Sequence, residues 1–328
     1  MVRILLVSLA FIMVSCGKNN VKTPQIISTR EVANNGHIIV EATFDDASRM
    51  CFKTISATEA EVSSAKNFYL EDSTYWKYEG NVVVPEEFTH YGQTYSVVGI
   101  GQAAFYDCEA LTSVDIPETV GYISIGAFTD CAELEIVKIP SRIEEIGGYA
   151  FAGCKKLASI NIPDGIREIQ WYTFTNCESL TSVHIPNSVE TVGMMSFYQC
   201  KNLALVEMPS VMGVVTGAFG GCENLKEITM PAMEYISTSV FSGCTSLQSV
   251  ELPSTLVFLD GHAFGNCVSL SSVICSATTP PTNDNNSSVY GDPFNGCPLQ
   301  EIKVPSASVD AYKSADKWAK YADIIVGM

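Results

Sequence analysis

Cysteine is the residue of this sequence with the greatest potential for chemistry. The 328-residue chain contains 12 cysteines, a number that in an exported protein normally indicates disulfide bonds. Nine of them, however, share one setting, Phe-x-x-Cys, and the sequence has no Cys-x-x-Cys pair for zinc or for a redox-active dithiol. The nine are Cys108, Cys131, Cys154, Cys177, Cys200, Cys222, Cys244, Cys267 and Cys297.

Other residue types that support catalysis are scattered. The four histidines, His37, His90, His184 and His262, have no paired spacing. The sequence also lacks a Gly-x-Ser-x-Gly elbow, a phosphate-binding loop and an HExxH helix. We therefore predict no catalytic residue, no metal ligand and no cofactor, and we interpret the chain as a protein without enzymatic activity.

The cysteines belong to a long-range repeat. The nine phenylalanines are spaced by 23, 23, 23, 23, 22, 22, 23 and 30 residues, and Leu follows each of the first eight cysteines by three positions. An alternating segment that ends in proline comes next, as in Val183-His184-Ile185-Pro186. A fixed period of this length indicates a solenoid of the leucine-rich-repeat type.

The repeat predicts how one coil is built. In Val-x-Ile the two aliphatic side chains point inward and the middle residue points outward, and the neighbouring coils complete a parallel ladder. The cysteines recur at an inward-facing position, so we predict a column of buried thiols, because stacked side chains point in parallel and not at one another. We predict a tight turn at Gly101, Gly147 and Gly193, four residues before a phenylalanine.

The template Ile-Gly-x-x-Ala-Phe-x-x-Cys-x-x-Leu-x-x-Val-x-Ile-Pro resembles the BspA-like leucine-rich-repeat family over about residues 76–328. The segments Ile100–Phe105 and Leu111–Pro117 match it almost residue for residue. The resemblance implies an α/β-type solenoid, a right-handed coil with a parallel β ladder on one face and a C-terminal capping helix. It also implies a bacterial surface protein, since members of the family are largely adhesins and host-interaction proteins.

The first residues have the pattern of an export signal. Arg3 precedes an apolar run, and Val14-Ser15-Cys16-Gly17 resembles the lipobox of bacterial lipoproteins, in which the cysteine is acylated. We predict a signal peptide at residues 1–15 and a lipid-anchored tether at residues 16–35 that begins at Cys16. The protein is then exported and anchored in the outer membrane, and the sequence leaves open the side of that membrane on which it is displayed.

The rest of the chain divides into three parts. Residues 36–98 are predicted as a β-rich N-terminal region and cap, with strands at Ile38–Phe44 and Met50–Ile55 and a hairpin from Tyr78–Pro85 and Tyr91–Val97. Residues 99–305 form the solenoid, with a loop insertion at 276–293. Residues 306–328 form the capping helix, with Ser308 as its N-cap. The sequence does not predict the redox state of Cys51 and Cys275.

The charge of the chain restricts its partners. Nineteen Lys and Arg against 36 Asp and Glu give a net charge of −17. A surface this acidic repels nucleic acid and anionic lipid, so membrane contact is expected only through the anchor. We expect a monomer that binds a host or microbial protein or, as the alternative, a polysaccharide.

Solenoids bind along the face lined by their strands. The outward positions with binding potential are Asp115, Ile136, Lys138, Asn161, His184, Leu205, Glu207, Thr229 and Glu251. Ile136 and Leu205 are aliphatic where other coils mostly have serine, which makes them candidate contacts, although single exposed aliphatic residues are common. The predicted function is an adhesin or interaction scaffold; the alternatives are a glycan-binding accessory lipoprotein and a structural spacer. These outward-facing positions contain no aromatic residue. Trp171-Tyr172 lies on the return leg, the part of each coil that leads from one strand to the next, and we interpret this pair as packing.

Overall fold

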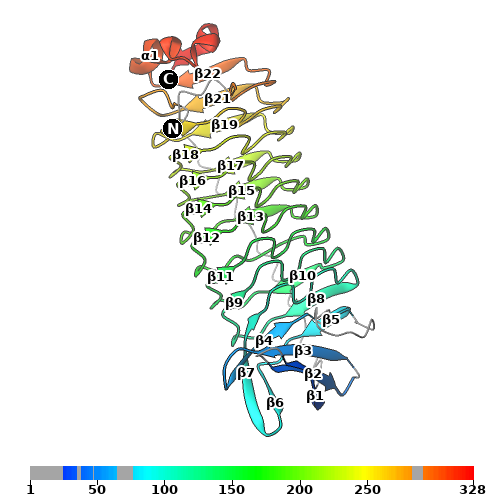
Figure 1. Ribbon diagram of the computed structural model, residues 1–328. Helices are drawn as coiled ribbons and strands as arrows, with labels where there is room; N and C mark the ends of the chain where they lie inside the picture. Colours follow the sequence, from blue (N-terminus) through cyan, green and yellow to red (C-terminus); the bar gives the residue numbers. More distant parts are fainter. Residues whose placement is uncertain (1–24, 35–37, 47, 65–76, 283–290) are drawn as a thin grey trace, which may run out of the picture.

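The computed structural model describes residues 25–34, 38–46, 48–64, 77–282 and 291–328 and shows an elongated solenoid (Figure 1). The coils rise from an N-terminal sheet at one end to the short helix α1 (Val309–Ser314) at the other. The predicted parallel β solenoid with a short C-terminal helix is confirmed. The predicted signal peptide and Cys16 lie outside the described residues.

One column of strands, called the strand face below, lies where the Val-x-Ile segments predict it. All pairs within this column are parallel. Its members are β5 (Gly80–Val83), β8 (Leu111–Asp115), β10 (Ile136–Lys138), β13 (Ser182–His184), β15 (Leu205–Glu207), β17 (Glu227–Thr229), β19 (Ser249–Leu252), β21 (Ser272–Cys275) and β22 (Glu301–Val304).

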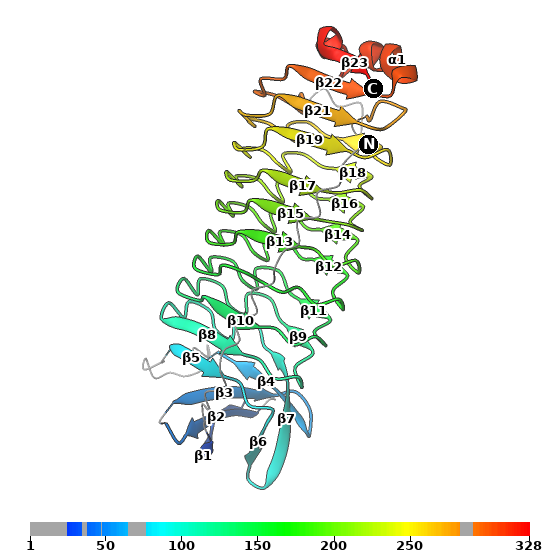
Figure 2. The ribbon, with the colours of Figure 1, turned by 180° about the vertical axis from the view of Figure 1, so that it is seen from behind.

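A second column of parallel strands, which the sequence did not reveal, runs along the return leg of the coils (Figure 2). Each strand has only two residues, so no alternating pattern can develop within it. The members are β9 (Tyr122–Ile123), β11 (Glu145–Ile146), β12 (Glu168–Ile169), β14 (Thr191–Val192), β16 (Gly213–Val214), β18 (Tyr235–Ile236) and β20 (Phe258–Leu259).

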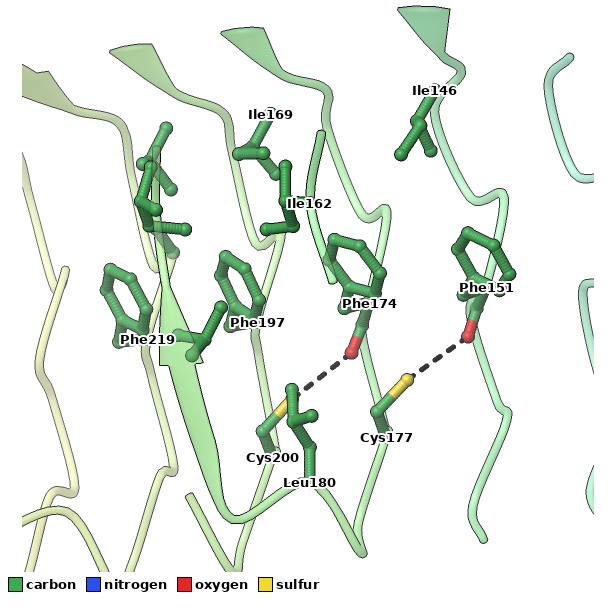
Figure 3. Close-up of a cluster of buried hydrophobic side chains, with 14 of the residues drawn as sticks. Ile146, Phe151, Ile162, Ile169, Phe174, Cys177, Leu180, Phe197, Cys200 and Phe219 are labelled. Atoms are coloured by element: carbon green, nitrogen blue, oxygen red, sulfur yellow. Dashed lines mark hydrogen bonds between the residues drawn. The ribbon is translucent and has the colours of Figure 1, made fainter. Parts of the chain in front are cut away.

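Stacked phenylalanines form the centre of the core (Figure 3). From Phe105 to Phe294, consecutive rings lie 4.9–5.6 Å apart between centroids with interplanar angles of 3–17°. Parallel strands are spaced at roughly 4.8 Å, so the backbone ladder imposes this ring spacing. A coil alone would leave its phenylalanine exposed, and stacking buries every ring of the column to 1% exposure or less.

Every thiol of the column after Cys108 donates a hydrogen bond to the coil before it. Cys177 Sγ donates to the carbonyl oxygen of Phe151 and Cys200 Sγ to that of Phe174, both at 3.2 Å (Figure 3). The same bond recurs from Cys131 to Cys297 with Sγ–O distances of 3.0–3.4 Å. All nine cysteines are free thiols, buried except for the half-buried Cys297. Cysteine therefore combines apolar packing with a bond between coils.

The predicted turns at Gly101, Gly147 and Gly193 are confirmed, because the carbonyl oxygen of each glycine accepts a hydrogen bond from the N–H of the residue three positions later. None of the three has a positive φ, so the turn itself does not require glycine. A Cβ on Gly147 would lie 2.6 Å from the backbone nitrogen of Ile125, and a Cβ on Gly193 would lie 2.6 Å from the carbonyl oxygen of Ile169. Glycine is needed there because adjacent coils approach closely. The left-handed residues lie two positions before and two after the phenylalanine, as at Tyr149 (φ 57°) and Gly153 (φ 76°) around Phe151.

The N-terminal region closes the first coil. Strands β1 (Ile26–Asn34), β2 (Ile38–Phe44), β3 (Arg49–Thr54) and β4 (Glu59–Ser63) are consecutive antiparallel neighbours. β4 pairs in parallel with β7 (Gln93–Ile100), which forms a hairpin with β6 (Glu87–His90) and pairs onward with β9. The N-terminal sheet is thus continuous with the return-leg ladder and covers its open edge.

Two expectations for this region need correction, although its strands at 38–44 and about 50–55 match β2 and β3. The predicted tether at 16–35 is wrong for residues 26–34, which form β1 and obtain their hydrogen bonds from β2. The expected hairpin partner at Tyr78–Pro85 also differs, because β5 joins the strand face through β8. The partner of β1 is the next strand in the sequence, whereas β5 pairs with a strand that lies a full coil further along the chain.

The C-terminal cap is built from several short pieces. Helix α1 ends at Ser314, a 3₁₀ helix follows at Ala319–Ile324, and β23 (Ile325–Gly327) adds a final parallel strand to β22. Ser308 makes no N-cap hydrogen bond, because its hydroxyl donates to the carbonyl oxygen of Thr278. Trp318 Nε1 donates to the carbonyl oxygen of Pro281 at 3.1 Å. Residues of the predicted insertion at 276–293 therefore hold the cap, and its part at 283–290 lies outside the described residues.

Removal of one ring from the phenylalanine stack should destabilise the solenoid strongly. Phe174→Ala leaves a cavity between Phe151 and Phe197 and should lower the free energy of unfolding by about 3–5 kcal/mol. Urea denaturation followed by circular dichroism measures this loss. The control Val257→Ala, at a position 51% exposed, should change the free energy by less than about 0.5 kcal/mol. Equal effects of the two substitutions would contradict the stacked core.

The thiol column should make the protein sensitive to alkali. Burial raises the pKa of Cys200 to about 12 and places those of Cys177 and Cys222 well above the ordinary range. In the unfolded chain thiols ionise near pH 8.5. The stabilisation that the buried, protonated thiols provide is therefore complete below about pH 8.5. It is lost as the pH rises toward about 12, because over this range the unfolded chain releases the thiol protons and the folded chain does not.

We therefore expect the free energy of unfolding, measured in urea, to fall from about pH 8.5 upward by about 1.4 kcal/mol per pH unit for each core thiol. Cys200→Ala should be less stable at neutral pH and should show a shallower decline in alkali. Identical slopes for the variant and the wild type would show that Cys200 does not titrate in this way.

Candidate ligand-binding face

The register of the strand face aligns most of the predicted outward residues. Asp115 lies opposite Lys138, and His184 lies opposite Glu207. Glu207 in turn lies opposite Thr229 on β17. Ile136 pairs with Ser113 in the neighbouring outward column. The two columns recognised in the sequence therefore form rows of residues along the paired strands of the solenoid.

These rows are interrupted at two places. Asn161 is exposed, but its segment is not a strand, so the ladder is broken between β10 and β13. Glu251 lies on β19, which belongs to a separate sheet with β21, β22 and β23. The strand face thus consists of three consecutive sheets. Nothing in the structure explains the break at Asn161.

Ionisable side chains pair along the row from one coil to the next. Lys138 Nζ lies 2.5 Å from Asp115 Oδ2, and His184 Nδ1 lies 2.9 Å from Glu207 Oε2. The side chains are exposed by 68% and 45% in the first pair and by 63% and 44% in the second. Exposed pairs of this kind contribute little to stability, typically about 0–1 kcal/mol. Their charges therefore remain accessible to a partner.

The two aliphatic candidates differ in exposure. Ile136 is 57% exposed, whereas Leu205 is half-buried. The expectation that both stand out from the polar row therefore holds fully only for Ile136. The strand face presents one prominent apolar side chain next to the Lys138–Asp115 pair.

The sequence missed residues at the N-terminal end of the strand face. Asn81 on β5 accepts hydrogen bonds at Oδ1 from the hydroxyls of Thr112 and Ser113, at 3.0 and 2.8 Å. A depression of about 240 Å³ lies beside it, with Arg49 and Lys77 among its lining residues. The repeat pattern could not indicate Asn81, because β5 precedes the first complete repeat.

The buried thiols of the column are poor nucleophiles. The thiolate is the nucleophilic form of cysteine, and the raised pKa values of Cys177, Cys200 and Cys222 keep these three thiols protonated. Within the described ranges, no group of three or more His, Cys, Asp or Glu side chains is arranged to hold a metal ion. No helix among these residues is long and apolar enough to cross a membrane.

Comparison with known proteins identifies the family. A family model described as a BspA type leucine rich repeat region matches residues 98–215 and 214–315, with six copies. The chain belongs to the BspA-type leucine-rich-repeat family. The resemblance found in the repeat template is thereby confirmed.

Solved structures agree with this assignment. A leucine rich repeat protein of T. pallidum is 29% identical, with a TM-score of 0.51, over 66% of this chain and 91% of that one. A leucine rich cell surface protein of Faecalibacterium prausnitzii is 22% identical, with a TM-score of 0.54, over 85% of this chain and 92% of that one; this second likeness shows the fold alone. No curated protein matches the chain in sequence.

Proposed function

We propose that this BspA-type chain is a non-enzymatic binding module of the bacterial cell envelope, and that its strand face captures a protein partner. The observation that carries the proposal is the position of Ile136. Its exposed side chain stands beside a charged pair on a face lined mainly by polar residues, where Leu205 is only half-buried. Protein interfaces have this composition, with a small apolar centre and a polar rim.

The ionisable side chains around Ile136 would make the strand face specific for its protein partner. Asp115 and Lys138 flank Ile136 at the N-terminal end, and His184 and Glu207 lie further along. Complementary charges on a partner would fix the register of binding and accelerate encounter. Both outward columns lack aromatic side chains, which favours a protein over a sugar on this face.

The proposed location follows from the first residues of the chain. A signal peptide at 1–15 and acylation of Cys16 would anchor the protein in the outer membrane. We expect the anchored protein to be a monomer. The lipobox-like Val14-Ser15-Cys16-Gly17 supports this anchor, and the F. prausnitzii protein of the same fold is described as a cell surface protein. An anchored solenoid would present its strand face at the end of a short tether.

The substitution Ile136→Ser tests the strand face. Serine is the residue at the equivalent positions 113, 159, 182 and 249, so the variant should fold with unchanged stability. We expect adhesion of cells that carry the variant to mucosal cell layers to fall about 5- to 30-fold, the loss typical of a central contact residue. Purified wild-type chain in excess should block adhesion, and purified variant should not.

The matched control is Val268→Ser, which removes an aliphatic side chain with 58% exposure outside the strand face. Adhesion of this variant should equal that of the wild type. If both variants adhere normally, Ile136 is not a contact residue and the proposed face is wrong.

A further inference from the structure

A cluster of aromatic side chains lies on the return leg, away from the strand face. Tyr149 and Tyr172, from adjacent coils, stack with their ring centroids 4.7 Å apart and an interplanar angle of 7°. Trp171 stands at 88° to the ring of Tyr149, 4.9 Å away. The two tyrosines thus form a stack along the solenoid, and the indole lies across it.

The indole is held flat against the coil that precedes it. A Cβ on Gly148 would lie 2.8 Å from Trp171 Cε2 and 2.9 Å from Cδ2, the two atoms shared by both rings of the indole. The centre of one indole face therefore covers Gly148. Trp171 is nevertheless 40% exposed, which leaves its opposite face toward solvent. The sequence-based interpretation of Trp171-Tyr172 as packing describes only the inner side of this cluster.

The cluster is maintained at a conformational cost. Tyr149 and Tyr172 both have φ 57°, a left-handed backbone that costs a bulky residue on the order of 1 kcal/mol or more. The equivalent residue is left-handed in six other coils as well; it is glycine at Gly126 and Gly217 and another residue at Ala103, Met195, Ser239 and His262. The left-handed backbone is thus a feature of the repeat, and these two coils differ in carrying large aromatic rings there.

Hydrogen-bonding groups lie beside the cluster. A depression of about 580 Å³ crosses β11 and β12, and its wall includes Gln170, the residue before Trp171, together with Arg167 and the carboxylates of Glu144, Glu145, Asp164 and Glu168. Gln170 Nε2 lies 3.4 Å from Glu168 Oε2. Carboxylates, an amide and a guanidinium are groups that bind sugar hydroxyls.

We propose that Trp171 and this depression form a binding site for a neutral polysaccharide. The apolar face of one hexopyranose ring stacks on the exposed indole face, and hydroxyls of the neighbouring sugar bind to Gln170 and Glu168. A cationic group would instead require rings that converge around it, and the parallel tyrosines do not converge. The site lies outside the strand face and goes beyond the proposed capture of a protein.

The test is affinity electrophoresis of the full mature chain in gels that contain starch, xyloglucan, laminarin or mannan. At least one of these neutral polysaccharides should retard the wild type, and Trp171→Ala should weaken the binding at least about tenfold, a typical effect for loss of a stacking residue. Binding should also quench tryptophan fluorescence, which Trp171→Ala should abolish. Trp318 is buried and should not respond.

Two further variants separate binding from folding. Tyr172→Gly removes one supporting ring but relaxes a left-handed residue, so its melting temperature should not fall, while its binding should weaken several-fold. Ile136→Ser should be retarded like the wild type, because the strand face is not involved. The proposal is overturned if none of the four polysaccharides retards the wild type, or if Trp171→Ala is retarded equally. Binding of a lysine-rich peptide through Trp171, without polysaccharide binding, would also overturn it.

Discussion

The hydrogen-bonded register between neighbouring coils is the constraint on which the rest of this structure depends. It places equivalent residues of successive coils about 5 Å apart, so each inward position becomes a column that must pack against itself. Phenylalanine satisfies this requirement by stacking, with rings 4.9–5.6 Å apart. Cysteine satisfies it with a small apolar side chain that also bonds to the preceding coil. Stability is thus a sum of contacts between neighbours.

The same register organises the exterior, where packing imposes no residue type. Outward positions of adjacent coils are brought together, as in the Lys138–Asp115 and His184–Glu207 pairs. Changes there cost little stability, and a family with one core can therefore present many surfaces. In this chain Ile136 interrupts a polar row, and Trp171 with its two tyrosines forms an aromatic cluster at the turn of two adjacent coils.

Features that repeat were predictable from the sequence, and features that depend on one distant contact were not. The period predicted the solenoid, the inward Phe and Cys columns and the outward row from Asp115 to Glu251. The second ladder was missed because strands such as Tyr122–Ile123 are too short to show alternation. β1 was mistaken for a tether because its polar segment shows no periodicity, although it pairs with β2, the next strand in the sequence. The turn at Gly147 was predicted, but the close approach to Ile125 that requires glycine there exists only between coils. The exposure of Ile136 relative to Leu205 required the packed structure.

Protease treatment of intact cells tests the central claim, a binding surface displayed by the bacterium, most directly. Cells are treated before and after lysis, and the chain is detected with an antibody against residues 306–328, with a periplasmic protein as the control for cell integrity. The account predicts that the signal disappears from unbroken cells while the periplasmic control survives. Full protection of the chain until lysis would contradict surface capture and would place the solenoid on the periplasmic side.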